Sequence, residues 1–151
     1  MKRTTAGLAL LALFAAGCGG DDEEALSKPE YVKQGNAICA KFNKDIEADT
    51  EKAFAGIESE KDLTADVART FFEGALPKFN AAIDDLKELK APEGDEETVD
   101  KIYEAGEKEA DQISDAMEDD AKVKALVTSE SVTPEFEKLS KDYGLDTCAS
   151  D

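Results

Sequence analysis

The amino-acid sequence predicts an all-α protein, in the form of an up-and-down four-helix bundle with a short fourth helix. From residue 29 onward, apolar residues recur at spacings of three and four almost throughout, which is the period of one helix face. No segment alternates apolar and polar residues as a half-buried strand does. Capping and turn residues divide the pattern into four stretches, and short connections between such helices favour antiparallel neighbours.

Two helices are expected between residues 27 and 89. The first begins at the capping box Ser27-Lys28-Pro29-Glu30 and ends near Gly56. The second begins at another capping box, residues 59–62. Its apolar residues share one helix face: Val67, Phe71, Ala75, Phe79, Ile83, Leu86 and Leu89.

Two more helices are expected after a turn at residues 91–94. Asp95 supplies the cap of the third helix, whose apolar stripe extends from Val99 to Ala121. Thr133 marks the start of the fourth helix and Gly144 marks its end. This last helix is short, which completes the predicted four-helix bundle.

The first 17 residues have the composition of a signal peptide. Lys2 and Arg3 precede a short apolar run, residues 6–16, which falls below the ~20 apolar residues that a membrane-spanning helix needs. The segment Ala15-Ala16-Gly17-Cys18 resembles the lipobox of bacterial lipoproteins. The resemblance implies that residues 1–17 are removed and that Cys18 is acylated. The protein would then be anchored by lipid to the cell membrane, on its extracytoplasmic face.

Two alternatives to lipidation stay open: cleavage by an ordinary signal peptidase, which leaves Cys18 as a free thiol on a secreted protein, and retention in the cytosol. On the lipoprotein interpretation, residues 18–28 form a lipidated acidic tether, because two glycines and four acidic residues follow Cys18. Residues 29–151 have the usual size of one domain and are assigned to a single helical-bundle domain.

The chain is strongly acidic, with a formal net charge of −18 at pH 7. Such a surface repels nucleic acid, and no polybasic segment is present to attract an anionic membrane surface. We therefore expect no nucleic-acid partner and a membrane attachment that depends on lipid. A basic protein or cations are the partners that this charge favours.

The sequence contains three cysteines. With Cys18 as the lipidation site, Cys39 and Cys148 remain, and the thiols of an exported protein meet an oxidising environment. We therefore predict a disulfide between Cys39 and Cys148. Two buried thiols are the alternative. A zinc site is disfavoured because the chain contains no histidine and the two cysteines lie far apart.

A second resemblance involves both of these cysteines. The segment Asn36-Ala37-Ile38-Cys39, together with Tyr143-Gly144-Leu145 and Cys148, resembles a group of small all-helical bacterial lipoproteins whose function is unassigned. The similarity spans most of the mature chain. It agrees with the predicted disulfide and implies no particular activity.

Catalytic motifs are missing from the sequence. The chain has no histidine, no nucleophile elbow, no phosphate-binding glycine loop, no dinucleotide fingerprint and no EF-hand loop. We therefore expect no enzymatic activity and no cofactor. A carboxylate-dependent hydrolase is the enzymatic alternative, because carboxylate pairs are abundant.

An acidic row is the clearest polar pattern of the third predicted helix. Spacings of three and four place on one side Asp100, Glu104, Glu107, Asp111, Asp115 and Glu118. Five of these are weak candidates for a divalent-cation site: Glu104, Glu107, Asp111, Asp115 and Glu118. The row could also dock a basic partner, or it could be an ordinary solvated face of an acidic protein.

The adjacent residues Phe71 and Phe72 cannot both follow one line of a helix. Either one of them lines a groove or meets a partner, or both lie on a broad core face. The function that we predict is a lipid-anchored extracytoplasmic binding or scaffolding module of the cell envelope, acting through its acidic surface or a groove between helices. Divalent-cation binding, hydrolysis and simple adaptation to salt are the alternatives.

Overall fold

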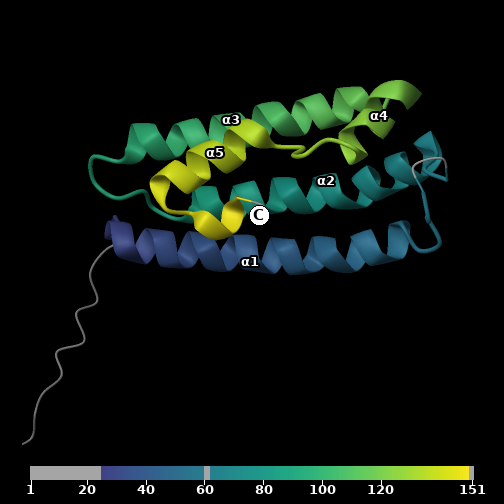
Figure 1. Ribbon diagram of the computed structural model, residues 1–151. Helices are drawn as coiled ribbons and strands as arrows, with labels where there is room; N and C mark the ends of the chain where they lie inside the picture. The colour runs from purple at the N-terminus through teal and green to yellow at the C-terminus, as the bar shows by residue number, and fades with distance from the viewer. Residues whose placement is uncertain (1–24, 60–61, 150–151) are drawn as a thin grey trace, which may run out of the picture.

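Three long helices form the frame of the protein (Figure 1). The structure is a computed structural model and describes residues 25–59 and 62–149. Within these residues, the backbone forms helices and no strand, which confirms the predicted all-α class. The elements are α1 (Lys28–Ala53), α2 (Ala65–Glu88), α3 (Glu96–Ala116), α4 (Asp120–Val127), α5 (Pro134–Tyr143) and the short 3-10 helix η1 (Asp146–Cys148).

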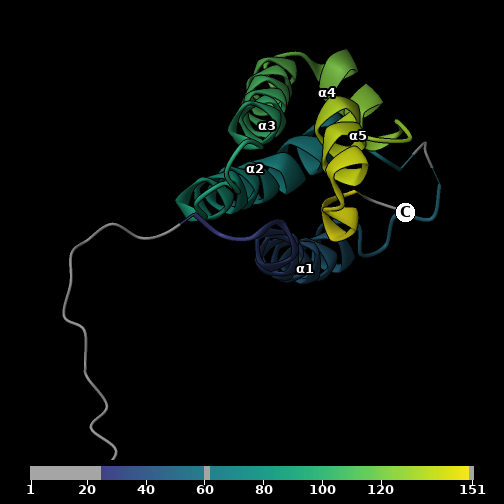
Figure 2. The ribbon, with the colours of Figure 1, turned by 90° about the vertical axis from the view of Figure 1, so that its left-hand side faces the viewer.

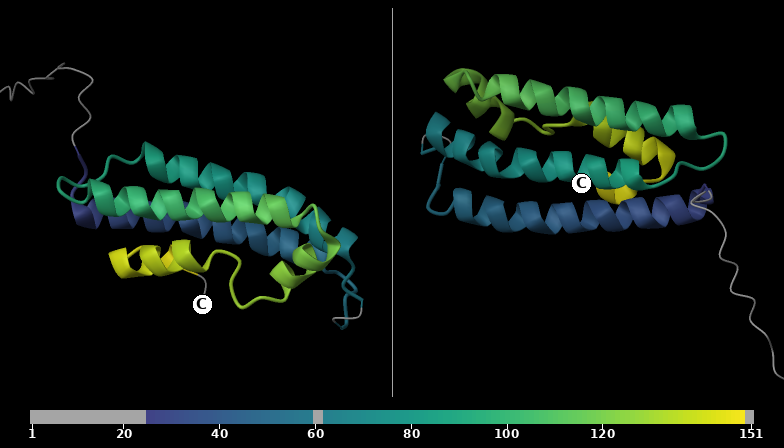
Figure 3. Two further views of the ribbon diagram at one scale, coloured as in Figure 1. Left: turned by 90° about the horizontal axis from the view of Figure 1, so that it is seen from above. Right: turned by 180° about the vertical axis from the view of Figure 1, so that it is seen from behind.

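The long helices lie side by side in the order α1, α2, α3, with α2 in the middle (Figures 1 and 3). The short C-terminal elements cover one side of this row, as the end-on view shows (Figure 2). There α5 packs against α3, while η1 packs against α1. Among the described elements, α1 packs along α2 and against η1, and it meets α5 only near its own start, where Tyr31 packs on Tyr143. The second half of α1 therefore has one helical neighbour where a four-helix bundle provides two.

The expectation of four helices, the third extending to Ala121, is wrong, because the described residues contain five α-helices. The third helix ends at Ala116, and after a turn the separate helix α4 begins at Asp120. The Asp119 carboxylate accepts hydrogen bonds from the backbone N–H groups of Ala121 and Lys122, both at 2.9 Å. These bonds lower the pKa of Asp119 and make it the N-cap of α4.

The corner between α3 and α4 is held from α2 by one arginine. The Arg69 guanidinium donates to the Met117 carbonyl at 2.9 Å and to the Asp120 carboxylate at 2.7 Å. Both acceptors belong to the turn that ends α3 or to the first residue of α4. The last quarter of the bundle is consequently split into α4 and α5, which are joined by residues 128–133.

The predicted start of the second helix at residues 59–62 is also wrong. The Ser59 hydroxyl donates to the Asp62 carboxylate at 2.7 Å, and the Asp62 N–H donates to the Ser59 carbonyl at 2.9 Å. These contacts close a separate turn before the helix. Helix α2 begins at Ala65, where the Thr64 hydroxyl accepts a hydrogen bond from the Val67 N–H at 3.2 Å.

The predicted end of α5 at Gly144 is confirmed. Gly144 has a φ of 105°, a left-handed conformation that favours glycine at a helix C-terminus. The following residue, Leu145, turns back and is fully buried against α1. A Cβ on Gly35 would lie 2.6 Å from a Leu145 methyl carbon, so α1 needs glycine there to admit this side chain.

The buried side chains form two clusters along the frame. The larger one, near the start of α1, contains Tyr31, Leu86, Ile102 and Leu145 among others. The smaller one, at the opposite end, is built around Phe72 and Val123. Leu76 packs against both clusters, and the candidate site described below lies where they meet. None of the helices in the described ranges has the length and apolar character that crossing a membrane requires.

Candidate functional site

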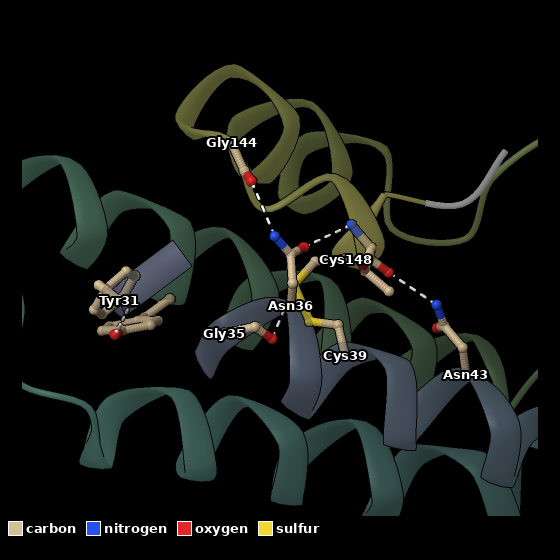
Figure 4. The surroundings of a disulfide bond; sticks show 9 residues. Tyr31, Gly35, Asn36, Cys39, Asn43, Gly144 and Cys148 are labelled. Atoms are coloured by element: carbon tan, nitrogen blue, oxygen red, sulfur yellow. Dashed lines mark hydrogen bonds between the residues drawn. A yellow bond between two sulfur atoms is a disulfide. The ribbon is translucent and has the colours of Figure 1, made fainter. Parts of the chain in front are cut away.

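The disulfide joins α1 to η1, which confirms the predicted pairing of Cys39 with Cys148 (Figure 4). The two Cα atoms lie 5.0 Å apart, and both residues are buried. Besides the packing of Tyr31 on Tyr143 near the start of α1, the disulfide and its surroundings attach the C-terminal segment to the first helix.

Two asparagines of α1 reinforce this attachment (Figure 4). The Asn36 amide donates to the Gly144 carbonyl at 3.1 Å and accepts from the Thr147 N–H at 2.8 Å. One turn beyond Cys39, the Asn43 amide donates to the Thr147 carbonyl at 2.8 Å. We call Asn36, Cys39 and Asn43, with the segment they hold, the C-terminal lock. It gives a structural reason for four residues of the second resemblance, since Asn36 contacts Gly144 and Cys39 is bonded to Cys148.

The tyrosines of the chain are all buried near the start of α1. The Tyr103 hydroxyl donates to the Leu86 carbonyl at 2.7 Å and therefore accepts the hydrogen bond from the Tyr31 hydroxyl. The Tyr143 hydroxyl donates to the Asp95 carboxylate at 2.8 Å, a bond that lowers the pKa of Asp95. Burial raises the pKa of Tyr31, Tyr103 and Tyr143 above the usual tyrosine value.

An apolar groove of about 460 Å³ lies beside the disulfide, between α1, α2 and the segment that leads into α5. Six of the seven phenylalanines of the chain line it: Phe42, Phe54, Phe71, Phe72, Phe79 and Phe136. Cys148 closes one end, so the C-terminal lock forms part of its wall. We call this feature the apolar groove.

The wall formed by α1 explains why the groove exists. Phe42, Ile46, Thr50 and Phe54 follow one another at intervals of four residues, which places them on one side of the helix. The backbones of α4 and α5 do not pack against this side of α1, and only side chains such as Leu126 and Phe136 face it across the groove. Phe42, Ile46 and Phe54 are consequently only half-buried, and Thr50 is exposed.

The opposite wall comes from α2. Phe72 and Phe79 are buried in it, while the neighbouring Phe71 is half-buried and packs on both Phe54 and Phe72. For the pair at 71 and 72, both alternatives have support: the two side chains share one core face in the smaller cluster, and both also line the groove.

Few polar groups reach the apolar groove, and none of them is basic. The third wall contains Ser129, Ser131 and Thr133, and the carboxylates near it are Glu130 and Glu137. No lysine or arginine lines the groove. An apolar ligand with a neutral or positive polar part therefore suits it better than one with a phosphate or carboxylate.

A buried carboxylate fixes α5, which carries Phe136 into the groove. Glu109 of α3 is only 4% exposed. Its two oxygens accept hydrogen bonds from the backbone N–H groups of Glu135 at 2.8 Å and Phe136 at 3.0 Å. Thr133 occupies the N-cap position of α5 as predicted, but its side chain makes no capping hydrogen bond. The Glu109 carboxylate satisfies the N-terminus of α5 in its place.

Replacement of Glu109 by glutamine is expected to lower the free energy of unfolding by about 1–3 kcal/mol, because the amide nitrogen cannot accept the hydrogen bond made by the carboxylate oxygen it replaces, and the charge is lost. Equilibrium unfolding in urea measures the change. Asp111→Asn is the matched control, since Asp111 is exposed on the same helix and a change near zero is expected. Equal effects of the two substitutions would contradict the capping role of Glu109.

The acidic row of the third helix lies on the surface. Glu104, Glu107, Asp111, Asp115 and Glu118 are all exposed. Lys87 of α2 forms an ion pair with Glu107, so the row already has one cationic neighbour within the chain. In the described residues, no three or more acidic or cysteine side chains are grouped so that they could hold a metal ion. Cys18, the predicted lipidation site, lies outside the described residues.

Sequence reasoning missed Glu109 and most of the groove. The position of Glu109 in the sequence already indicated that it is buried, because it lies three residues after Gly106 and one before Ala110, on the apolar side of its helix. An acid in that position needs a buried partner. For the groove, the sequence offered only the regular spacing of Phe42, Ile46 and Phe54. An ordinary core stripe has the same spacing, so this pattern alone does not indicate a groove.

Comparison of the chain with protein-family models, with curated proteins and with solved structures gives no significant match. The function is accordingly inferred from the geometry of the chain itself.

Proposed function

We propose that this protein is a lipid-anchored extracytoplasmic binding module of the cell envelope and that the apolar groove is its binding site. The observation that carries the proposal is the phenylalanine lining of a groove of about 460 Å³, in which Phe42, Phe54 and Phe71 are only half-buried. Ligand sites in proteins have typical volumes of ~300–1,000 Å³ and are lined by apolar and aromatic side chains with a few polar groups. The groove has this size and this lining.

The walls of the groove are held in place by buried side chains, a helix cap and the disulfide. Phe72 and Phe79 are buried in α2, and Glu109 fixes the start of α5 next to Phe136. The disulfide holds the end of the groove at Cys148. A rigid site loses little conformational entropy when a ligand binds, which favours affinity.

The membrane attachment in this proposal is lipid on Cys18, followed by a tether at residues 18–28. The groove begins at Phe42 and extends to Phe54, which places it about 20–40 Å along α1 from Lys28, at ~1.5 Å per residue. A tether attached at the start of α1 thus leaves the binding site at a distance from the point of attachment. This arrangement suits the presentation of the groove to other envelope components.

Site-specific photo-crosslinking in the native membrane tests both parts of the proposal. With a benzoylphenylalanine at Thr50, which is exposed in the groove, we expect a defined crosslinked product. The same residue at Glu104, exposed on α3 and outside the groove, should give none. In a Cys18→Ser background the chain should leave the membrane fraction. The binding proposal fails if positions 50 and 104 give the same products, and the anchoring proposal fails if Cys18→Ser stays in the membrane.

A further inference from the structure

We propose that the occupant of the apolar groove is a basic amphipathic helix of a partner protein, which packs beside α1 and completes the bundle there. This inference rests on the proposed function and adds to it the kind of partner. Three features of the molecule support it: the packing of α1, the dimensions of the groove and the charge around it.

The packing of α1 leaves room for one more helix. After Cys39, α1 continues for almost four turns to Ala53. Asn43 still contacts η1, but beyond it α2 is the helix whose backbone packs along α1 in the described residues. Its apolar side chains Phe42, Ile46 and Phe54 remain half-buried. A helix laid along this stretch would give α1 the second neighbour that bundle helices have, and it would bury these side chains.

The dimensions fit side chains from one face of a helix. From Phe42 to Phe54 the groove follows about 18 Å of α1, at ~1.5 Å per residue. A helical segment of that length, about 10–12 Å in diameter, occupies a volume on the order of 1,500 Å³. The groove holds about 460 Å³, so it takes the apolar face of such a helix while the rest stays outside. Apolar residues at helical spacing are the usual anchors in this mode of recognition.

The acidic groups around the groove favour a partner helix that is positively charged. Glu130 and Glu137 belong to its lining, no lysine or arginine does, and the chain has a net charge of −18. On the outer side of the α1 stripe, Glu47 and Glu51 are exposed one residue after Ile46 and Thr50. A helix with lysine or arginine beside its apolar face therefore meets acidic groups on both edges. An anionic lipid finds no basic group for its phosphate or carboxylate.

The test uses two labelled helical peptides that have the same leucine face and differ only in lysine or glutamate on the polar face. Fluorescence anisotropy measures their binding to the acylated mature chain in phosphatidylcholine nanodiscs, with empty nanodiscs subtracted. We expect the lysine peptide to bind at least tenfold more tightly than the glutamate peptide and to weaken as salt is raised. Thr50→Trp, which fills the groove, should weaken binding at least tenfold. Thr98→Trp, at an exposed position of α3, should leave it unchanged.

A charge reversal provides a second variant that leaves the groove lining intact. Glu47→Lys combined with Glu51→Lys should reduce the preference for the lysine peptide at least threefold. Equal binding of both peptides, or binding that Thr50→Trp does not change, would overturn the helical partner. Binding of monopalmitoylglycerol that Thr50→Trp abolishes, without peptide binding, would also overturn it but would preserve the proposed binding groove. If neither probe binds, the helical partner and the proposed function both fail.

Discussion

Replacing Cys39 and Cys148 together by alanine is expected to lower the free energy of unfolding by about 4–5 kcal/mol, the value that chain entropy gives for a loop of about a hundred residues. The two cysteines are separated by 109 positions, so the disulfide closes a loop of this size. A loss of that order is a large part of the stability of an ordinary domain. The free energies come from urea unfolding with and without the substitutions.

The reduced wild-type chain is the control for this prediction. It lacks the covalent bond but keeps both sulfur atoms. The difference between its free energy of unfolding and that of the double alanine variant therefore measures the contribution of side-chain packing at the two positions. We expect most of the loss to be present on reduction alone. A change below about 1 kcal/mol on reduction would mean that Asn36, Asn43 and Leu145 hold the C-terminal lock without help from the covalent bond.

Alkaline pH is expected to unfold the protein steeply once it exceeds about 10. Tyr31, Tyr103 and Tyr143 are buried with raised pKa values, so the folded chain keeps all three protons where the unfolded chain loses them. Their contribution to stability is complete below the unfolded pKa of about 10 and is lost as the pH rises above it. Three such groups lower the free energy of unfolding by about 4 kcal/mol per pH unit, at ~1.4 kcal/mol each.

Tyrosinate absorbance measures this directly, because the chain contains three tyrosines and no tryptophan. We expect the absorbance to appear together with the loss of helical circular dichroism, in one transition. This readout separates the tyrosines from lysines, which also lose protons in this range. A tyrosine that titrates near pH 10 while the helices remain intact would contradict the prediction for that residue.

The disulfide and several helix ends could be predicted because their causes are local or compositional. Gly144 ends a helix by its own backbone preference, and the pairing of Cys39 with Cys148 was predicted from the two cysteines that remain besides Cys18 in a chain with a predicted signal peptide. These inferences needed no knowledge of how the helices pack.

The corrections have long-range or competing causes. The apolar stripe of the third helix continues past Ala116, so periodicity alone extends it, whereas the Asp119 cap and the contact of Arg69 with Met117 end it. The second helix had two possible caps, and Thr64 prevails over Ser59. The groove depends on the backbones of α4 and α5 staying away from the second half of α1, a property of tertiary packing that no spacing in the sequence records.

The C-terminal lock has a consequence for the biogenesis of the protein. Asn36 and Asn43 belong to α1, the first helix, and the groups they bind arrive only about a hundred residues later in synthesis. Such distant contacts slow the completion of folding. The covalent part of the lock also requires an oxidising compartment. If the chain is exported unfolded, as its predicted signal peptide implies, it acquires the lock, and with it one end of the groove, only after translocation.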